Sequence, residues 1–184
     1  MSRTAAAATT GFPLRCQTRA VPTRRLVLVR HAEAGSAAVD ADRPLTAAGA
    51  HRATAIGTWL ADNGMTPARA LVSPARRTVE TWERAGGVAP VLDPRLYDNT
   101  VEALLEVVRE TPDEVDQLAV VGHNPSISVL AALLDDGQGD DAAGRGSAGG
   151  FPSGGVAVLE LSTPFSAVGP GGARLSAFAV PGSD

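Results

Sequence analysis

Histidine and arginine residues stand at three points of the sequence where a run of apolar residues ends. Arg30 and His31 follow "LVLV", His123 ends "QLAVVGH", and Arg77 comes four residues after "ALVS". An arginine side chain is permanently charged and binds phosphate oxygens through a planar fork of N–H donors. A neutral imidazole can attack phosphorus, and a protonated imidazole can donate a hydrogen bond to the transferred group. These residue types therefore predict a site for a tetrahedral oxyanion, with covalent phosphoryl transfer through histidine.

Alternating strand and helix patterns explain how these residues would meet. Buried apolar runs predict strands, and apolar residues at helical spacing predict helices between them. This alternation is typical of a three-layer α/β/α fold with a mostly parallel central sheet, in which ligands bind at the carboxyl ends of the strands. We predict strands at 26–29, 68–73, 117–123, 154–161 and 173–180, a short strand within 90–98, and helices at 46–63, 74–86, 99–110 and 124–134.

The predicted helices carry recognisable start signals. Thr46 can cap the first helix, and Ser73 followed by Pro74 has the pattern of an N-cap and a first helical residue. Asn124 and Pro125 repeat that pattern. Free N–H groups at the start of this last helix would favour an anion beside His123.

Composition limits the class of protein. A chain of 184 residues suits one domain, which we place at 25–184 with a mobile Gly-rich loop at about 135–152. Residues 1–24 contain no acidic residue and lack the apolar segment of a secretory signal, so we expect a disordered tail, with an organellar transit peptide as the alternative. The net charge of -4 argues against a nucleic-acid-binding polycation. A single cysteine, Cys16, and the lack of a long apolar run favour a cytoplasmic protein without membrane contact.

Four sequence blocks resemble the histidine phosphatase superfamily, whose fold is phosphoglycerate mutase-like. "LVLVRHAEAG" is similar to its Arg-His-Gly (RHG) signature, with Ala32 in place of glycine. "DRPLTAAGAHRA", "LVSPARRTVET" and "VVGHNPSI" resemble its following blocks, in the same order and over residues 26–134. The short chain is most similar to the small bacterial phosphohistidine phosphatases.

This resemblance implies a role for each site residue. It makes His31 the nucleophile that becomes phosphorylated, and it makes Arg30 and Arg77 ligands of the phosphoryl oxygens. His123 would complete the pocket and stabilise the transition state, and Arg43 would be a further phosphate contact. Consecutive helical side chains diverge by roughly 100°, so we expect Arg76, the neighbour of Arg77, to face solvent.

The sequence leaves the general acid open. Larger relatives have a glutamate between the second arginine and the second histidine, where this chain offers Tyr97 and Asp98. Glu33 and Asp42 are the other candidates. A phosphohistidine substrate releases imidazole, which is a much weaker base than an alkoxide, so its cleavage tolerates a poor acid.

The predicted function is a metal-independent phosphatase that acts on protein phosphohistidine through a covalent intermediate on His31. Two alternatives remain: a small-molecule phosphomonoesterase or mutase of the same superfamily, and a non-catalytic binder of phosphate or phosphoprotein. No cofactor or metal is expected, because the three histidines are scattered, without cysteine partners. The partner would be a phosphorylated protein or small phosphoester, with no nucleic acid, and the oligomeric state is left open.

Overall fold

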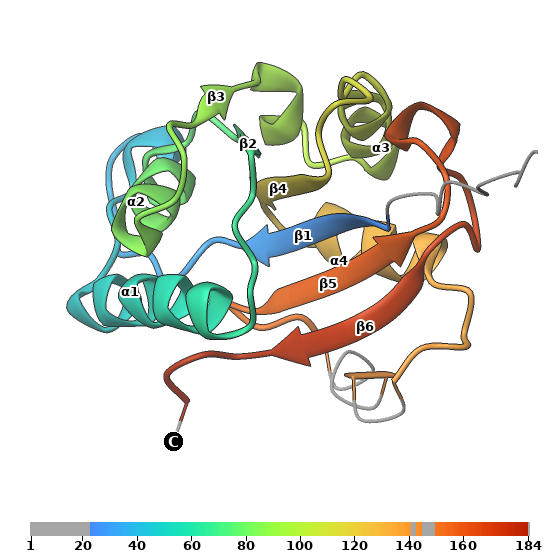
Figure 1. The fold of residues 1–184 in the computed structure, drawn as a ribbon. Coiled ribbons are helices and arrows are strands. Elements are labelled where there is room, and N and C mark those ends of the chain that lie inside the picture. The colour runs from blue at the N-terminus through green and yellow to red at the C-terminus, as the bar shows by residue number, and fades with distance from the viewer. Residues whose placement is uncertain (1–22, 141–142, 145–149, 184) are drawn as a thin grey trace, which may run out of the picture.

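A mixed six-stranded β-sheet lies between two layers of helices in the computed structural model, which describes residues 23–140, 143–144 and 150–183 (Figure 1). The strand order is β3-β2-β4-β1-β5-β6. The strands are β1 (Arg24–Arg30), β2 (Arg69–Val72), β3 (Val91–Leu92), β4 (Gln117–Gly122), β5 (Val156–Leu161) and β6 (Arg174–Ala179). The α-helices are α1 (Ala47–Asp62), α2 (Arg76–Ala85), α3 (Val101–Arg109) and α4 (Ser126–Leu134), and the short 3-10 helices are η1 (Asp40–Asp42), η2 (Pro94–Tyr97) and η3 (Phe165–Ala167).

The strand directions confirm the predicted, mostly parallel sheet. β1, β2, β3 and β4 pair in parallel, whereas β5 is antiparallel to both β1 and β6. Parallel strands end at the same edge of a sheet, so whatever follows β1, β2 and β4 is delivered to one place.

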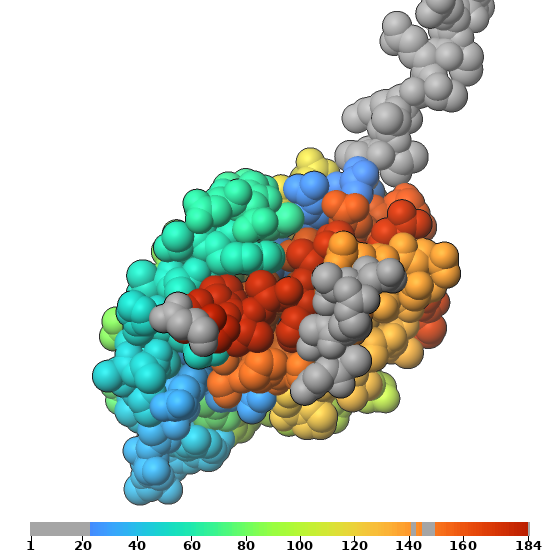
Figure 2. Space-filling view, turned by 90° about the horizontal axis from the view of Figure 1, so that it is seen from below, coloured from blue at the N-terminus to red at the C-terminus, as the bar shows by residue number. Residues whose placement is uncertain are grey.

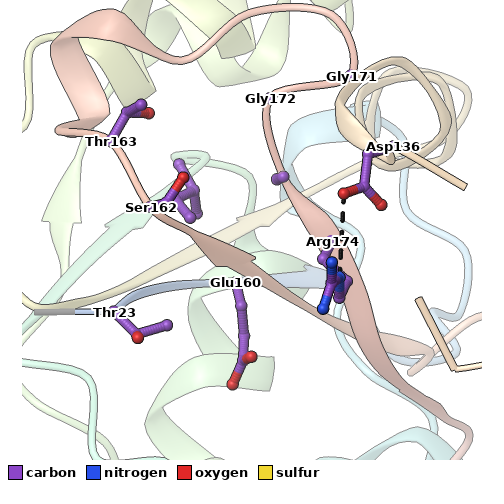
Figure 3. Close-up of a pocket in the computed structure, with 10 residues that line it drawn as sticks. Thr23, Asp136, Glu160, Ser162, Thr163, Gly171, Gly172 and Arg174 are labelled. Atoms are coloured by element: carbon purple, nitrogen blue, oxygen red, sulfur yellow. Dashed lines mark ion pairs between the residues drawn. The ribbon is translucent and has the colours of Figure 1, made fainter. Parts of the chain in front are cut away.

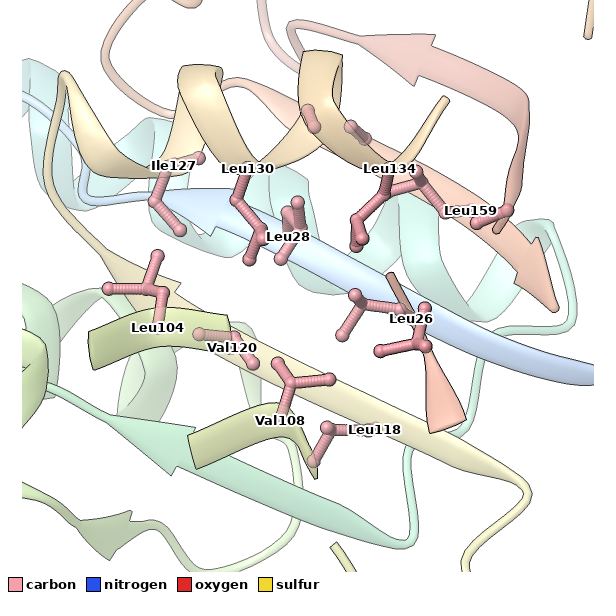
Figure 4. Packing of buried hydrophobic residues seen from close by; sticks show 14 of the residues in the cluster. Leu26, Leu28, Leu104, Val108, Leu118, Val120, Ile127, Leu130, Leu134 and Leu159 are labelled. Carbon is pink, nitrogen blue, oxygen red and sulfur yellow. The ribbon is translucent and has the colours of Figure 1, made fainter. Parts of the chain in front are cut away.

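Alternation along β1 separates the two cores. Leu26 and Leu28 point to the face covered by α3 and α4, where they pack against residues such as Leu130 (Figure 4). Val27 and Val29 point to the opposite face, which α1 and α2 cover. Because successive side chains of a strand face opposite sides, a strand buried on both faces is continuously apolar. The three-layer prediction is thus confirmed by the packing.

One predicted boundary needs correction. β1 begins at Arg24 and not at Leu26, because Arg24 and Arg25 already pair with the end of β5, so the predicted tail 1–24 runs too far. Residues 1–22, which include Cys16, lie outside the described residues. Within the predicted loop at about 135–152, residues 141–142 and 145–149 are not described, and Phe151 near its end is buried and packs edge-on against Phe178.

Two predicted helix caps are wrong. Ser73 caps nothing, since α2 begins three residues later with Ala75 at the N-cap and no side-chain cap bond. Asn124 does not cap α4 either; instead Asn99, from another segment, accepts a hydrogen bond from the amide of Ser126. Thr46 does cap α1 as predicted, accepting from the amide of Gly49. No helix among the described residues is long and apolar enough to cross a membrane.

The packing predicts a contrast between two neighbours on α4. Leu130 is fully buried in the core, whereas Val129 is 45% exposed. Leu130→Ala should lower the free energy of unfolding by about 3 kcal/mol, through lost apolar burial and the cavity left behind. Val129→Ala should change it by less than about 0.5 kcal/mol. Urea titrations of both variants measure the difference, and similar losses would contradict this placement of α4.

Candidate active site

One cavity of about 390 Å³ lies at the sheet edge where the parallel strands β1, β2 and β4 end. Five separate segments of the chain contribute to its wall. All five residues predicted to bind or attack phosphate line it together. The complete lining is Arg30, His31, Asp40, Arg43, Arg77, Tyr97, Asn99, His123 and Asn124.

A second cavity of about the same volume lies at the opposite end of β1, between the end of β5 and the start of β6 (Figure 3). Its lining includes Thr23, Glu160 and Asp136, and its one arginine, Arg174, is exposed and paired with Asp136 at 3.9 Å. It has no histidine or cysteine among its lining residues. Cationic and nucleophilic groups therefore converge at the first cavity.

The His31 ring is held so that one particular nitrogen is free. Its Nδ1 lies 2.7 Å from the carbonyl oxygen of Ala32. A carbonyl only accepts, so Nδ1 carries the proton and Nε2 keeps its lone pair. Burial lowers the pKa of His31 to about 4; the Ala32 hydrogen bond opposes this shift, and the charges of nearby arginines add to it. The ring is therefore neutral at pH 7, which is the form that can attack phosphorus.

Two contacts fix the backbone on which this geometry depends. The Ala32 amide donates to Thr81 Oγ1 on α2 at 3.0 Å, and the Thr46 amide at the start of α1 donates to the Glu33 carbonyl at 3.0 Å. Gly49 on α1 lies so close that a Cβ there would meet the Glu33 oxygen at 2.0 Å. The segment after His31 is thus clamped between α1 and α2.

His123 lies beside His31, with ring centroids 5.2 Å apart and a tilt of 60°. Its Nδ1 is 3.3 Å from Arg77 Nη2, and its Nε2 is 2.8 Å from Ser73 Oγ. A guanidinium only donates, so Nδ1 is the acceptor and Nε2 carries the proton toward Ser73. Burial, and after it the positive charge of Arg77, lower the pKa of His123 to about 3.

The two arginines differ in their surroundings but share one feature. Arg77 is buried and donates to the backbone carbonyl of Asp40 at 2.8 Å, while Arg30 donates to the carbonyl of Phe151 at 2.7 Å. The Nε atoms of both arginines are buried and have no hydrogen-bond partner among the described residues. The Nε atoms of Arg24 and Arg69, which do not line the cavity, are also buried without a partner among the described residues, so this feature is not specific to the site.

Neighbouring Arg76 points elsewhere. It is exposed and forms an ion pair with Glu80 at 2.6 Å, one helical turn along α2. Arg76 is not among the residues that line the cavity, as the helical spacing predicts.

Of the four acid candidates offered by the sequence, Tyr97 lines the cavity, whereas Glu33, Asp42 and Asp98 do not. Glu33 is exposed and accepts from the Thr46 hydroxyl at 2.7 Å, and Asp42 and Asp98 are exposed. The carboxylate that lines the cavity is Asp40, which the sequence reasoning missed. The Tyr97 hydroxyl, with Arg43 and Arg77, holds the pKa of Asp40 at about 2, so this group is ionised at pH 7.

Three other polar residues shape the site, although no site role was predicted for them. Ser73 is fully buried against His123, and Asn99 donates to the carbonyl of Asn124 at 2.7 Å. Asn124 in turn donates to the carbonyl of Phe151 at 2.8 Å. The amide of Ser126 is already bound to Asn99, so it is not a free anion donor as predicted. Among the described residues, no group of three or more His, Cys, Asp or Glu could hold a metal ion.

Comparison with known proteins identifies the family to which the chain belongs. Residues 26–102 match the profile of the histidine phosphatase superfamily, branch 1. The uncharacterized protein Rv1276c of Mycobacterium tuberculosis is 36% identical over 157 residues, which cover 83% of this chain and 99% of the relative.

Two solved structures are similar over nearly their whole length. One is the proposed phosphohistidine phosphatase SixA of Nakamurella multipartitia, with a TM-score of 0.78, 32% identity, and coverage of 88% of this chain and 98% of that chain. The other, the proposed SixA of Agrobacterium tumefaciens, has a TM-score of 0.70, 32% identity, and coverage of 87% and 99%.

The two adjacent arginines of α2 should differ in their effect on oxyanion binding. Arg77→Ala removes a buried cation from the cavity and should weaken the binding of orthovanadate about a hundredfold, or roughly 3 kcal/mol. Arg76→Ala removes the same charge from an exposed position and should change binding by less than about twofold. Isothermal titration of both variants measures this, and equal effects would contradict the site.

The two neutral histidines should make stability depend on pH. Below the ordinary pKa of 6.5 the unfolded chain binds protons on both rings, whereas the folded pKa values of about 4 and 3 keep them neutral in the native state. The free energy of unfolding should therefore fall as pH drops from 6.5 toward 4, by about 2 to 3 kcal/mol between pH 7 and 5.5 for the two rings together. Urea titrations across this range test the slope. A His31→Gln, His123→Gln double variant should lose most of it, and an unchanged slope would refute the assignment.

Proposed function

Because the chain belongs to the histidine phosphatase superfamily, we propose that it hydrolyses protein phosphohistidine through a covalent intermediate on His31. The observation that carries the proposal is the arrangement of His31: a neutral imidazole with its Nδ1 proton fixed by Ala32, its lone pair on Nε2, and arginines on the same cavity wall. The similarity to two proposed phosphohistidine phosphatases over most of the chain supports the substrate class.

In the first step, the Nε2 lone pair of His31 forms a bond to phosphorus. The P–N bond of the substrate breaks, and its electron pair returns to the substrate imidazole, which leaves neutral when its other nitrogen carries a proton. Arg30, Arg77 and Arg43 offset the charge of the phosphoryl oxygens. His123 turns Nδ1 toward Arg77 at 3.3 Å in the free protein, and a dianion on the arginines would favour its protonation and a further hydrogen bond.

In the second step, water attacks phosphorus on His31. The P–N electron pair returns to Nε2, and both protons of the water leave with the phosphate. His31 retains its Nδ1 proton throughout, held by the Ala32 carbonyl. The atoms therefore balance without a cofactor.

The state of the acidic residues supports phosphohistidine over an alkyl phosphate. An alkoxide leaving group requires a proton donor, and an imidazole is a far weaker base. Glu33, Asp42 and Asp98 do not line the cavity, and the carboxylate of Asp40 is ionised. Tyr97 does line it, but its hydroxyl donates to Asp40, and this hydrogen bond raises the pKa of Tyr97. Transfer between two like imidazoles is the reaction that makes the least demand on a proton donor in such a cavity.

Incubation with a phosphohistidine protein, with phosphoserine peptide and with p-nitrophenyl phosphate tests the proposal. We expect the phosphohistidine substrate to be turned over at least about a hundredfold faster than phosphoserine, since only its leaving group needs no acid. An alkaline quench should trap acid-labile phosphate on the wild type.

Two variants separate the outcomes. His31→Ala should lose turnover and the trapped phosphate, whereas His51→Gln, which alters an exposed histidine of α1, should retain both. Comparable rates for phosphoserine would favour a general phosphomonoesterase. No turnover of any substrate by the wild type would favour a phosphate binder.

A further inference from the structure

Asp40 already fills part of the cavity with an anion. Its Oδ2 accepts from the Tyr97 hydroxyl at 2.8 Å and from Arg77 Nη2 at 3.1 Å, and its Oδ1 accepts from Arg43 Nη1 at 3.1 Å. Two of the cations predicted to bind a phosphoryl group are thus paired with one carboxylate of the protein itself. An oxyanion that takes Arg77 Nη2 must break or share this ion pair.

The charge balance favours displacement over sharing. Three arginines line the cavity, and Asp40 lowers their net charge from +3 to +2 while both histidines are neutral. A phosphoryl dianion beside the ionised carboxylate would place like charges within one small cavity, which is unfavourable at short range.

The side chain of Asp40 can turn away from Arg77, while the Asp40 backbone carbonyl still accepts from Arg77 at 2.8 Å. Asp40 opens η1, a short helix with no buried residues, and its side chain is 55% exposed. In the space-filling view, the light-blue segment between β1 and α1 projects from the body of the molecule (Figure 2). Its base is closed by the Gly35 amide, which donates to the Pro44 carbonyl at 2.8 Å. A shift of Asp40 therefore leaves both cores intact.

We propose that Asp40 is a specificity-determining residue, a resident anion that an incoming phosphoryl group must displace from Arg77. The inference rests on the proposed phosphoryl site. Free phosphate has only its oxygens to compete with Asp40, whereas a phosphorylated protein adds contacts outside the cavity. Asp40 thus weakens the binding of free phosphate relative to substrate, and it favours release of the product when it returns to Arg77.

Binding of inorganic phosphate to the free protein, measured by isothermal titration, tests this proposal without any turnover. Asp40→Asn removes the charge and keeps the shape, so phosphate should bind about tenfold more tightly, and the gain should shrink as salt is raised. Asp42→Asn is the matched control, because it makes the same change of net charge two residues away, outside the cavity lining. Its affinity should stay within about twofold of the wild type.

The sign of the effect distinguishes this role from a merely structural one. Loss of loop structure would weaken phosphate binding, so unchanged or weaker binding by Asp40→Asn overturns the proposal, as does equal tightening by Asp42→Asn. Asp40→Ala gives a second measurement if the amide variant unfolds, and it should also tighten binding. If Asp40→Asn binds phosphate more tightly but the wild type hydrolyses no phosphohistidine, the role of Asp40 as a resident anion stands and the proposed reaction is rejected.

Discussion

The hydrogen bond from His31 Nδ1 to the Ala32 carbonyl is the interaction on which the site depends. It decides which ring nitrogen carries a proton, and so which one offers a lone pair. The Ala32 backbone is itself held through its amide by Thr81 of α2, and the next residue is held by the Thr46 amide at the start of α1. A helix on one face of the sheet thus controls the chemistry at the end of a strand, and the three-layer fold becomes part of the mechanism that we propose.

Burial and neighbouring positive charge outweigh the Ala32 hydrogen bond in setting the charge of His31. Burial and neighbouring guanidiniums keep both histidines uncharged. Arg77 and Ser73 form hydrogen bonds with the two ring nitrogens of His123, and Arg77 also donates to the carboxylate of Asp40. The free protein therefore presents a connected set of polar groups in which cations outnumber anions. Such an arrangement is stable without a ligand and still attracts an oxyanion.

Much of this architecture could be predicted from the sequence, because apolar periodicity reports the strands and helices directly. The convergence of His31, Arg77 and His123 follows from parallel strands that end at one edge. Two features could not be predicted. Ser73 has the local pattern of a helix cap, yet its hydroxyl binds His123, which is 50 residues away. In the sequence Asp40 looks like any acidic loop residue, and only the folded loop brings it to Arg77 and Tyr97. The local sequence indicates one of its contacts, the ion pair with Arg43, through their spacing of three residues.

The opposite direction of β5 has a consequence for which parts of the sequence are free to vary. The segments that follow the parallel strands line the cavity with side chains, and each of these must be a particular residue type to do its chemistry. The segment before β5 serves it through main-chain atoms: the Phe151 carbonyl accepts from Arg30, and the Gly154 amide donates to the carbonyls of Arg30 and His31. Every amino acid has a carbonyl group, so exchanges at Phe151 are limited by packing and those at Gly154 by its positive φ of 78°, whereas exchanges after β1, β2 and β4 are limited by chemistry.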